Sequence, residues 1–222
     1  MKSVLEIKDD ILQDNAKEAQ GIRQRLAESG TYMVNLMASP GAGKTSTILA
    51  VVKELQQDVT FAVIEGDIES FVDSEKVKEA GVTAVQIRTG GACHLDVPMV
   101  EPALDLLDLP STDCVFIENI GNLVCPAEFD LGADLNMMIL SVPEGHDKIL
   151  KYPLMFSMCD VLVVNKADYL QLPSNNFDVE FLTERMKAIN PEAKVFVISA
   201  YAGDGVPELA AWLKDQVHAK RG

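Results

Sequence analysis

Basic residues are scarce in this chain of 222 residues. Lys and Arg number 19 against 34 Asp and Glu, so the net charge is −15 with histidine neutral. Proteins that hold nucleic acids or anionic membranes do so chiefly through clustered Lys and Arg, and this balance therefore excludes a general binder of either. A phosphate group can bind here only through a local arrangement of donors.

Long apolar runs and abundant cysteine are also missing. No apolar run approaches the roughly 18 residues that a membrane-spanning helix needs, and the first twenty residues carry charges instead of a signal-peptide core. We therefore expect a cytoplasmic protein. Four cysteines are too few for a disulfide scaffold in a chain of this length, so chemistry or packing must account for them.

The sequence does contain a regular alternation of apolar and amphipathic segments. Apolar positions at helical spacing over 3–29 predict an amphipathic helix that packs on the outside of the core, and we treat residues 1–30 as this amino-terminal element. From Tyr32 onward, short apolar runs alternate with helix-length segments. Strands are expected at 32–38, 59–65, 82–88, 113–118, 135–142, 160–165 and 194–199, and helices at 44–56, 70–80, 97–108, 147–158, 178–189 and 206–219.

This alternation predicts one doubly wound α/β domain over residues 31–222. Several of the strands are nearly unbroken apolar runs, as expected for parallel strands that helices cover on both faces. We expect a mostly parallel seven-stranded sheet flanked by helices, with the amino-terminal helix added to it. In such folds ligands bind at the carboxyl ends of the strands.

A glycine-rich loop follows the first expected strand, in the sequence Ala38-Ser39-Pro40-Gly41-Ala42-Gly43-Lys44-Thr45. Such a loop before a helix is typical of a P-loop, in which backbone N–H groups surround a phosphate, the lysine reaches the β and γ phosphates and the Thr hydroxyl binds magnesium. Ala38 departs from the strict pattern, and the alternative is a glycine-rich turn without a ligand. The nucleotide-binding residues expected here are Gly41, Ala42, Gly43, Lys44, Thr45 and Ser46.

An N-K-x-D motif, Asn165-Lys166-Ala167-Asp168, follows the sixth expected strand. Asp168 can accept from N1–H and the 2-amino group of guanine, whereas adenine offers neither donor there. Lys166 would lie along the base and Asn165 would brace the loop. We expect Ser199 and Ala200 to offer backbone N–H to the guanine O6. The alternative is a solvated turn, which the P-loop upstream makes a poor explanation.

Two further carboxylates stand at strand ends, Asp67 in Glu65-Gly66-Asp67 and Glu118 in Glu118-Asn119-Ile120-Gly121. Magnesium takes oxygen ligands and keeps several waters, so Thr45 with Asp67 or Glu118 would complete a magnesium site beside the phosphates. With Lys44 these two are the expected catalytic residues. The alternative is that both carboxylates only cap the helices that follow them.

Cys93, His94 and Cys125 follow strands at the same expected edge. Two thiolates and one imidazole suit zinc or nickel, and their spacing is not that of a zinc finger. Cys93 and His94 are adjacent, so they need a local turn, or one of them faces another subunit. The alternative is ordinary packing, and burial is the expectation for Cys114 and Cys159. His146 and His218 belong to no cluster.

These motifs, in this order, resemble the HypB family of hydrogenase-maturation nickel-insertion GTPases, which are dimeric P-loop proteins. The resemblance runs from about residue 15 and also includes Thr89-Gly90-Gly91-Ala92-Cys93-His94, the Cys125-Pro126 that ends the segment beginning at Glu118, and Pro143-Glu144-Gly145-His146-Asp147-Lys148. It implies GTP hydrolysis with Mg²⁺, a homodimer favoured by GTP, and a nickel or zinc site of Cys93, His94 and Cys125 at the dimer interface. It also implies two partners, a small nickel metallochaperone and a hydrogenase large-subunit precursor.

The chain departs from that family in two respects. It has no Cys-rich or His-rich segment before Cys93, which weighs against a high-affinity nickel store, and no glutamine in the position that orients water in small signalling GTPases, so slow turnover is expected. Lys148 matches a family lysine that reaches across the dimer. Three alternatives stay open: a urease-type nickel GTPase, disfavoured because Cys-Pro-His is absent, a metal buffer with structural GTP, and an ATP-dependent kinase, disfavoured by Asp168.

Overall fold

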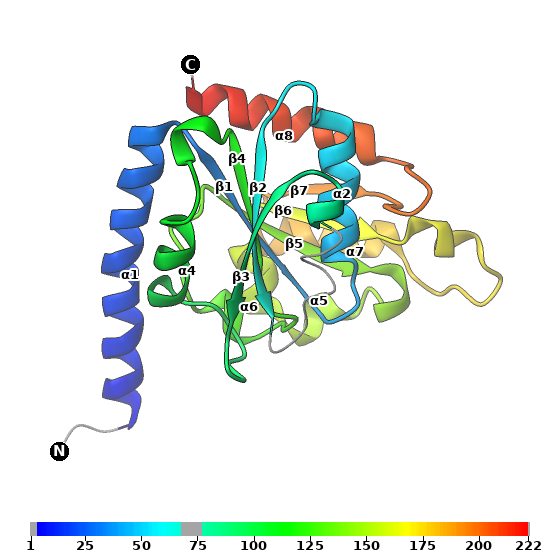
Figure 1. Ribbon diagram of the computed structural model, residues 1–222. Helices are drawn as coiled ribbons and strands as arrows, with labels where there is room; N and C mark the ends of the chain where they lie inside the picture. The colour runs from blue at the N-terminus through cyan, green and yellow to red at the C-terminus, as the bar shows by residue number, and fades with distance from the viewer. Residues whose placement is uncertain (1–3, 68–76, 222) are drawn as a thin grey trace.

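The seven strands of the computed structural model form one all-parallel sheet in the order β3-β2-β4-β1-β5-β6-β7 (Figure 1). The structure describes residues 4–67 and 77–221, with side chains from residue 9 and without that of Asp67. The strands are β1 (Tyr32–Ala38), β2 (Phe61–Asp67), β3 (Thr83–Arg88), β4 (Cys114–Glu118), β5 (Leu135–Ser141), β6 (Val161–Asn165) and β7 (Lys194–Val197). The predicted doubly wound sheet is confirmed, and in the described residues it is wholly parallel.

Helices cover both faces of this sheet (Figure 1). They are α1 (Val4–Ser29), α2 (Lys44–Leu55), α4 (Val97–Leu104), α5 (Lys148–Lys151), α6 (Pro153–Met158), α7 (Val179–Ile189) and α8 (Val206–Arg221), with short 3₁₀ turns η1 (Leu109–Ser111), η2 (Cys125–Ala127), η3 (Val142–Glu144) and η4 (Ala167–Gln171). Within the described residues, no helix is both long and apolar enough to cross a membrane.

The side chains of β1 alternate between two hydrophobic layers. Val34 and Leu36 pack against α2 and α8, whereas Met33 and Met37 face the opposite layer, which α1, α4, α6 and α7 cover. This alternation is expected because successive side chains of a strand point to opposite faces. A strand buried on both faces gives the nearly unbroken apolar run that predicted it.

Helix α1 packs on the core through a stripe at helical spacing. Ala19, Ile22 and Leu26 are buried against the α4 side of the sheet, and Asn15 continues the stripe. Ile11, one of the apolar positions that predicted the helix, is 53% exposed instead. Among the described side chains of α1, the first buried one is therefore polar, which hydrophobic periodicity cannot identify.

Two predicted helices differ in the structure. The helix expected at 147–158 is two helices, α5 and α6, because Pro153 disfavours helical geometry at the preceding residue and Tyr152 has φ −127° and ψ 53°. The helix expected at 97–108 ends at Leu104, whose carbonyl accepts a hydrogen bond from Arg25 of α1. Most of the helix expected at 70–80 lies outside the described residues.

The expectation that Cys114 and Cys159 are packing residues is confirmed. Both side chains have no exposed surface. Burial raises the pKa of the Cys159 thiol to about 12 and that of Cys114 further still. Each thiol is therefore protonated at neutral pH, and neither is a metal ligand or nucleophile.

Shortening Leu26 to alanine should destabilise the protein by about 2–4 kcal/mol, because a fully buried side chain leaves a cavity between α1 and the sheet. Ile11→Ala is the matched control on the same helix and should change the free energy of unfolding by less than about 0.5 kcal/mol. Denaturant unfolding of both variants measures the difference. Equal effects at the two positions would mean that the packing face of α1 is assigned wrongly.

Candidate functional site

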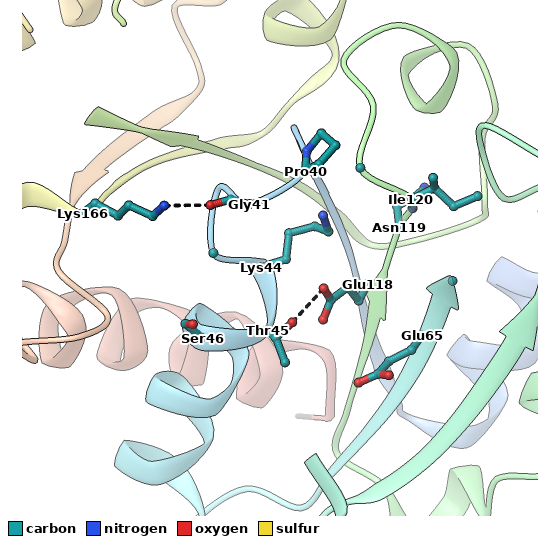
Figure 2. A pocket seen from close by; sticks show the side chains of 13 residues that line it. Pro40, Gly41, Lys44, Thr45, Ser46, Glu65, Glu118, Asn119, Ile120 and Lys166 are labelled. Atoms are coloured by element: carbon teal, nitrogen blue, oxygen red, sulfur yellow. Dashed lines mark hydrogen bonds between the residues drawn. The ribbon is translucent and has the colours of Figure 1, made fainter. Parts of the chain in front are cut away.

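The loop between β1 and α2 lines a pocket at the carboxyl edge of the sheet (Figure 2). Gly43 has φ 102°, and a Cβ at this position would lie 2.4 Å from the Asn165 amide nitrogen, so only glycine fits. Lys44, 9% exposed, and Thr45 follow at the start of α2 and line the pocket of about 520 Å³ with Gly41 and Ser46. Backbone N–H groups at a helix start together with a lysine form a phosphate-binding arrangement.

Glu118 lies beside this loop because β4 pairs directly with β1. The Thr45 hydroxyl donates to Glu118 Oε1 at 2.9 Å (Figure 2). Glu65 pairs with Glu118 in the ladder between β2 and β4, is also buried, and lines the same pocket, although its pattern in the sequence did not single it out. Hard oxygen donors of this kind fit Mg²⁺. Asp67 ends β2, and its side chain lies outside the described residues.

A second pocket of about 310 Å³ adjoins the first and contains the N-K-x-D motif. Asn165 donates from Nδ2 to the Ala42 carbonyl at 3.1 Å, and Lys166, with the positive φ of 60°, donates from Nζ to the Gly41 carbonyl at 2.8 Å. The motif is thus bound directly to the phosphate loop (Figure 2). Asp168 Oδ1 accepts from the Ser199 hydroxyl at 2.6 Å, which fixes the carboxylate at the pocket wall.

The loop after β7 completes this second pocket. The Ala200 N–H donates to Asn165 Oδ1 at 3.1 Å and the Ser199 N–H to the Asp204 carbonyl at 2.9 Å, so both amides predicted to bind a guanine O6 have acceptors within the protein. Their donation to O6 stays a prediction. Tyr169 and Tyr201 also line the pocket, and Tyr201 is 95% exposed. Sequence reasoning missed both, because an isolated tyrosine carries no motif.

Cys93, His94 and Cys125 come together in one chain. Their ligand atoms lie within 4.8 Å of one another, and within the described residues this is the one group of three or more such side chains. The Cys93 thiol lies 3.0 Å from Cys125 Sγ, and Cys93 Sγ is 3.6 Å from His94 Nδ1. Of the two arrangements expected for Cys93 and His94, the chain has the local turn, since Gly90 and Gly91 just before them both have positive φ. Two sulfurs and one imidazole nitrogen form a ligand set for zinc or nickel.

Neighbouring side chains orient and tune these ligands. The His94 ring stacks on Phe129 with centroids 3.7 Å apart, and Asn122 donates to the Cys93 carbonyl at 3.1 Å. Desolvation lowers the pKa of His94, so its imidazole is neutral at physiological pH. The hydrogen bond with Cys93, followed by burial, raises the pKa of the Cys125 thiol. Cys125 therefore carries a proton that a metal ion must displace.

Comparison with known proteins agrees with this geometry. Residues 32–197 match the family model described as the CobW/HypB/UreG nucleotide-binding domain. The hydrogenase maturation factor HypB of Escherichia coli K12 is 41% identical over 215 residues, which are 97% of this chain and 73% of that protein. The hydrogenase/urease maturation factor HypB of Helicobacter pylori J99 is 42% identical over 203 residues, which are 90% of this chain and 82% of that protein.

Two solved structures have the same fold over nearly their whole length. The crystal structure of HypB from Helicobacter pylori in complex with nickel has a TM-score of 0.87 and 38% identity, covering 93% of this chain and 96% of that one. HypB from Archaeoglobus fulgidus has a TM-score of 0.85 and 35% identity, covering 92% and 99%. The chain belongs to the HypB family. It therefore has a nucleotide-binding P-loop domain, as the sequence motifs indicated.

In this HypB-family chain, Zn²⁺ added to the protein should release close to two protons at pH 7.5. The thiols of Cys93 and Cys125 bind metals as thiolates, whereas His94 is already neutral and releases none. Zinc affinity should therefore rise with pH, and the raised pKa of Cys125 extends this rise to higher pH. Calorimetry in buffers of different ionisation enthalpy counts the protons. Cys114→Ala should behave as wild type, and uptake without proton release would refute the thiolate ligand set.

Proposed function

We propose that this protein is a GTP-hydrolysing metallochaperone that uses a GTP-dependent dimer to deliver nickel to a hydrogenase precursor. One observation carries the proposal: a single short segment, from Glu118 to Cys125, contains both a residue of the nucleotide pocket and a ligand of the metal cluster. The names of the HypB relatives support the process, hydrogenase maturation, and the nickel complex of one relative supports the cargo.

The proposal also covers the domain bounds, location, partners and resident metal of the protein. The GTPase domain would be residues 31–222 with the helix of 1–30 packed on it, acting in the cytoplasm. The protein's partners would be a second copy of the chain, a small nickel metallochaperone and the hydrogenase large-subunit precursor. The resident metal at Cys93, His94 and Cys125 would be nickel or zinc, with Lys148 reaching toward the partner's nucleotide.

The chain's own groups account for GTP binding and hydrolysis. Lys44 and the backbone N–H groups at the start of α2 would neutralise and orient the β and γ phosphates. Thr45, Glu118 and Asp67 would hold Mg²⁺, which supplies positive charge against the phosphate oxygens when bound. Within the described residues the pocket lining includes no glutamine, which supports a slow intrinsic rate.

Asp168→Asn should weaken GTP and GDP binding equally, by about 2–3 kcal/mol, because an amide replaces a carboxylate that accepts from two guanine donors. The base is common to both nucleotides, so their affinity ratio should not change. Titration with fluorescent GDP and GTP analogues measures both constants. Asp204→Asn is a matched control, a nearby acidic residue whose side chain is not in the pocket lining. Unchanged guanine affinity in Asp168→Asn would mean that this pocket does not bind the base.

The metal switch is tested by titrating Ni²⁺ and Zn²⁺ into the GDP form and the form with a nonhydrolysable GTP analogue, with light scattering on the same samples. The GTP analogue should favour the dimer, more so with added salt because the subunits carry −15 each. Metal affinity should differ between the two forms by roughly 5- to 150-fold. Cys125→Ala should reduce this difference, because one ligand that responds to the nucleotide is removed, and should keep GTP binding, whereas Lys44→Ala should lose hydrolysis and keep the fold.

Three results would argue against the proposal. Equal metal affinities in the GDP and GTP-analogue forms would leave a GTPase whose clustered thiols have another role. A chain that stays monomeric with the GTP analogue at high concentration would remove the dimer switch. Turnover of ATP at the rate of GTP would favour a kinase or a general NTPase instead.

A further inference from the structure

A buried asparagine stands immediately after Glu118 and belongs to both candidate sites. Asn119 is 1% exposed, follows the residue that accepts from Thr45, and lines the nucleotide pocket (Figure 2). Its side-chain Oδ1 accepts from the backbone N–H of Leu95 at 3.3 Å. Leu95 is the residue directly after His94. One amide therefore joins the nucleotide segment to the segment that carries two metal ligands.

The orientation of the Asn119 side chain is fixed by a chain of buried amides. Asn35 Nδ2 donates to Asn136 Oδ1 at 3.0 Å, which leaves Asn35 Oδ1 to accept from Asn119 Nδ2 at 3.1 Å. Asn35 lies in the middle of β1 and is 2% exposed. With its amino group held at the rigid centre of the sheet, Asn119 must direct its oxygen toward Leu95. A flipped Asn119 amide would face acceptor with acceptor at Asn35 Oδ1, and donor with donor at the backbone N–H groups of Leu95 and Ile120.

Leu95 contacts the other nucleotide segment as well. Its side chain is fully buried and packs so closely on Gly66 that a Cβ there would lie 2.8 Å from Leu95 Cδ1. Gly66 lines the nucleotide pocket at the end of β2. Leu95 thus lies between the ends of β2 and β4, the two segments next to the expected magnesium site.

On its other side, the metal segment is anchored away from the nucleotide. Asn15 of α1 accepts from the Val97 N–H at 3.0 Å and donates to the Asp130 carbonyl at 2.8 Å, and Asp96 caps α4 by accepting from the Met99 N–H. Residues 93–95 therefore connect a fixed helix start to a segment that lines the nucleotide pocket. A change in the position of the Asn119 oxygen would be passed to the Leu95 backbone and to the adjacent His94 and Cys93.

We propose that Asn119 is the positioning residue through which the bound nucleotide sets the geometry of Cys93 and His94. This inference rests on the proposed function, because it needs a nucleotide in the first pocket and a metal at the cluster. The proposed function couples nucleotide and metal only through the segment from Glu118 to Cys125. Here all three ligands would respond together, Cys125 through that segment and the other two through Asn119 and Leu95.

The first test follows the Leu95 amide in the metal-free, ¹⁵N-labelled full chain. Its hydrogen-exchange rate should differ between the GDP form and the GTP-analogue form, because its acceptor stands next to Glu118. This measurement needs no variant and no metal, so its failure is distinct from failure of the metal switch. An exchange rate that is the same in both forms, with both nucleotides bound, would overturn the inference.

The second test compares Asn119→Ala with Asn15→Ala by Zn²⁺ titration of the GDP and GTP-analogue forms. With each nucleotide at a saturating concentration, Asn119→Ala should reduce the affinity ratio between the forms several-fold and make the Leu95 amide exchange fast in both. Asn15→Ala, the matched control at the anchored end, should weaken zinc by the same factor in both forms and keep the wild-type ratio. If Asn119→Ala keeps that ratio, or Asn15→Ala loses it equally, Asn119 is only a structural amide.

Discussion

The parallel pairing of β1 with β4 is the constraint on which the rest of the site depends. Leu36 stands opposite Glu118 in this ladder, so the phosphate loop that follows β1 and the acidic segment that follows β4 leave the sheet side by side. Thr45 reaches Glu118 only because of this register. The same neighbourhood lets the Asn119 N–H donate to the Leu36 carbonyl, which ties the start of the segment to the central strand. A one-residue slip would turn Glu118 to the opposite face and separate the nucleotide pocket from the metal segment.

The nucleotide pocket gathers positive groups within a protein whose net charge is negative. A protein with net charge −15 repels a triphosphate at long range, and the first pocket adds the buried carboxylates Glu65 and Glu118 at short range. Lys44, Lys166 and the start of α2 offset part of this charge, and a divalent cation between the carboxylates and the phosphates would offset the rest. Binding of nucleotide and cation should therefore be strongly cooperative. This dependence would also suit the proposed switch, since loss of the γ-phosphate would remove negative charge from the pocket.

The sequence was sufficient wherever a residue's role depends on its immediate neighbours in the chain. Gly43 with its positive φ, the N-K-x-D turn and the apolar strands all follow from local rules, and the strand bounds differ from those predicted by no more than two residues. It was insufficient where a polar residue is buried by distant partners. Asn15 lies in the amphipathic helix, Asn35 within a predicted strand and Asn119 after one, and nothing in the sequence shows that each is buried and hydrogen-bonded to a residue more than 80 positions away. Whether a buried amide has hydrogen-bond partners depends on the tertiary fold, and the periodicity of the sequence cannot predict it.

The ligand set of the candidate metal cluster is the one that the proposed delivery of nickel would need. Structural zinc sites are closed by four protein ligands, whereas three come together here within the described part of the chain, and Cys93 among them is exposed. An incomplete, accessible set leaves room for a ligand from a second subunit or from an acceptor protein, which a site that must release its ion requires. The raised pKa of the Cys125 thiol would also favour release of a metal ion, because a proton competes with the metal for the sulfur. The buried apolar clusters lie around the sheet and do not include Cys93, His94 or Cys125.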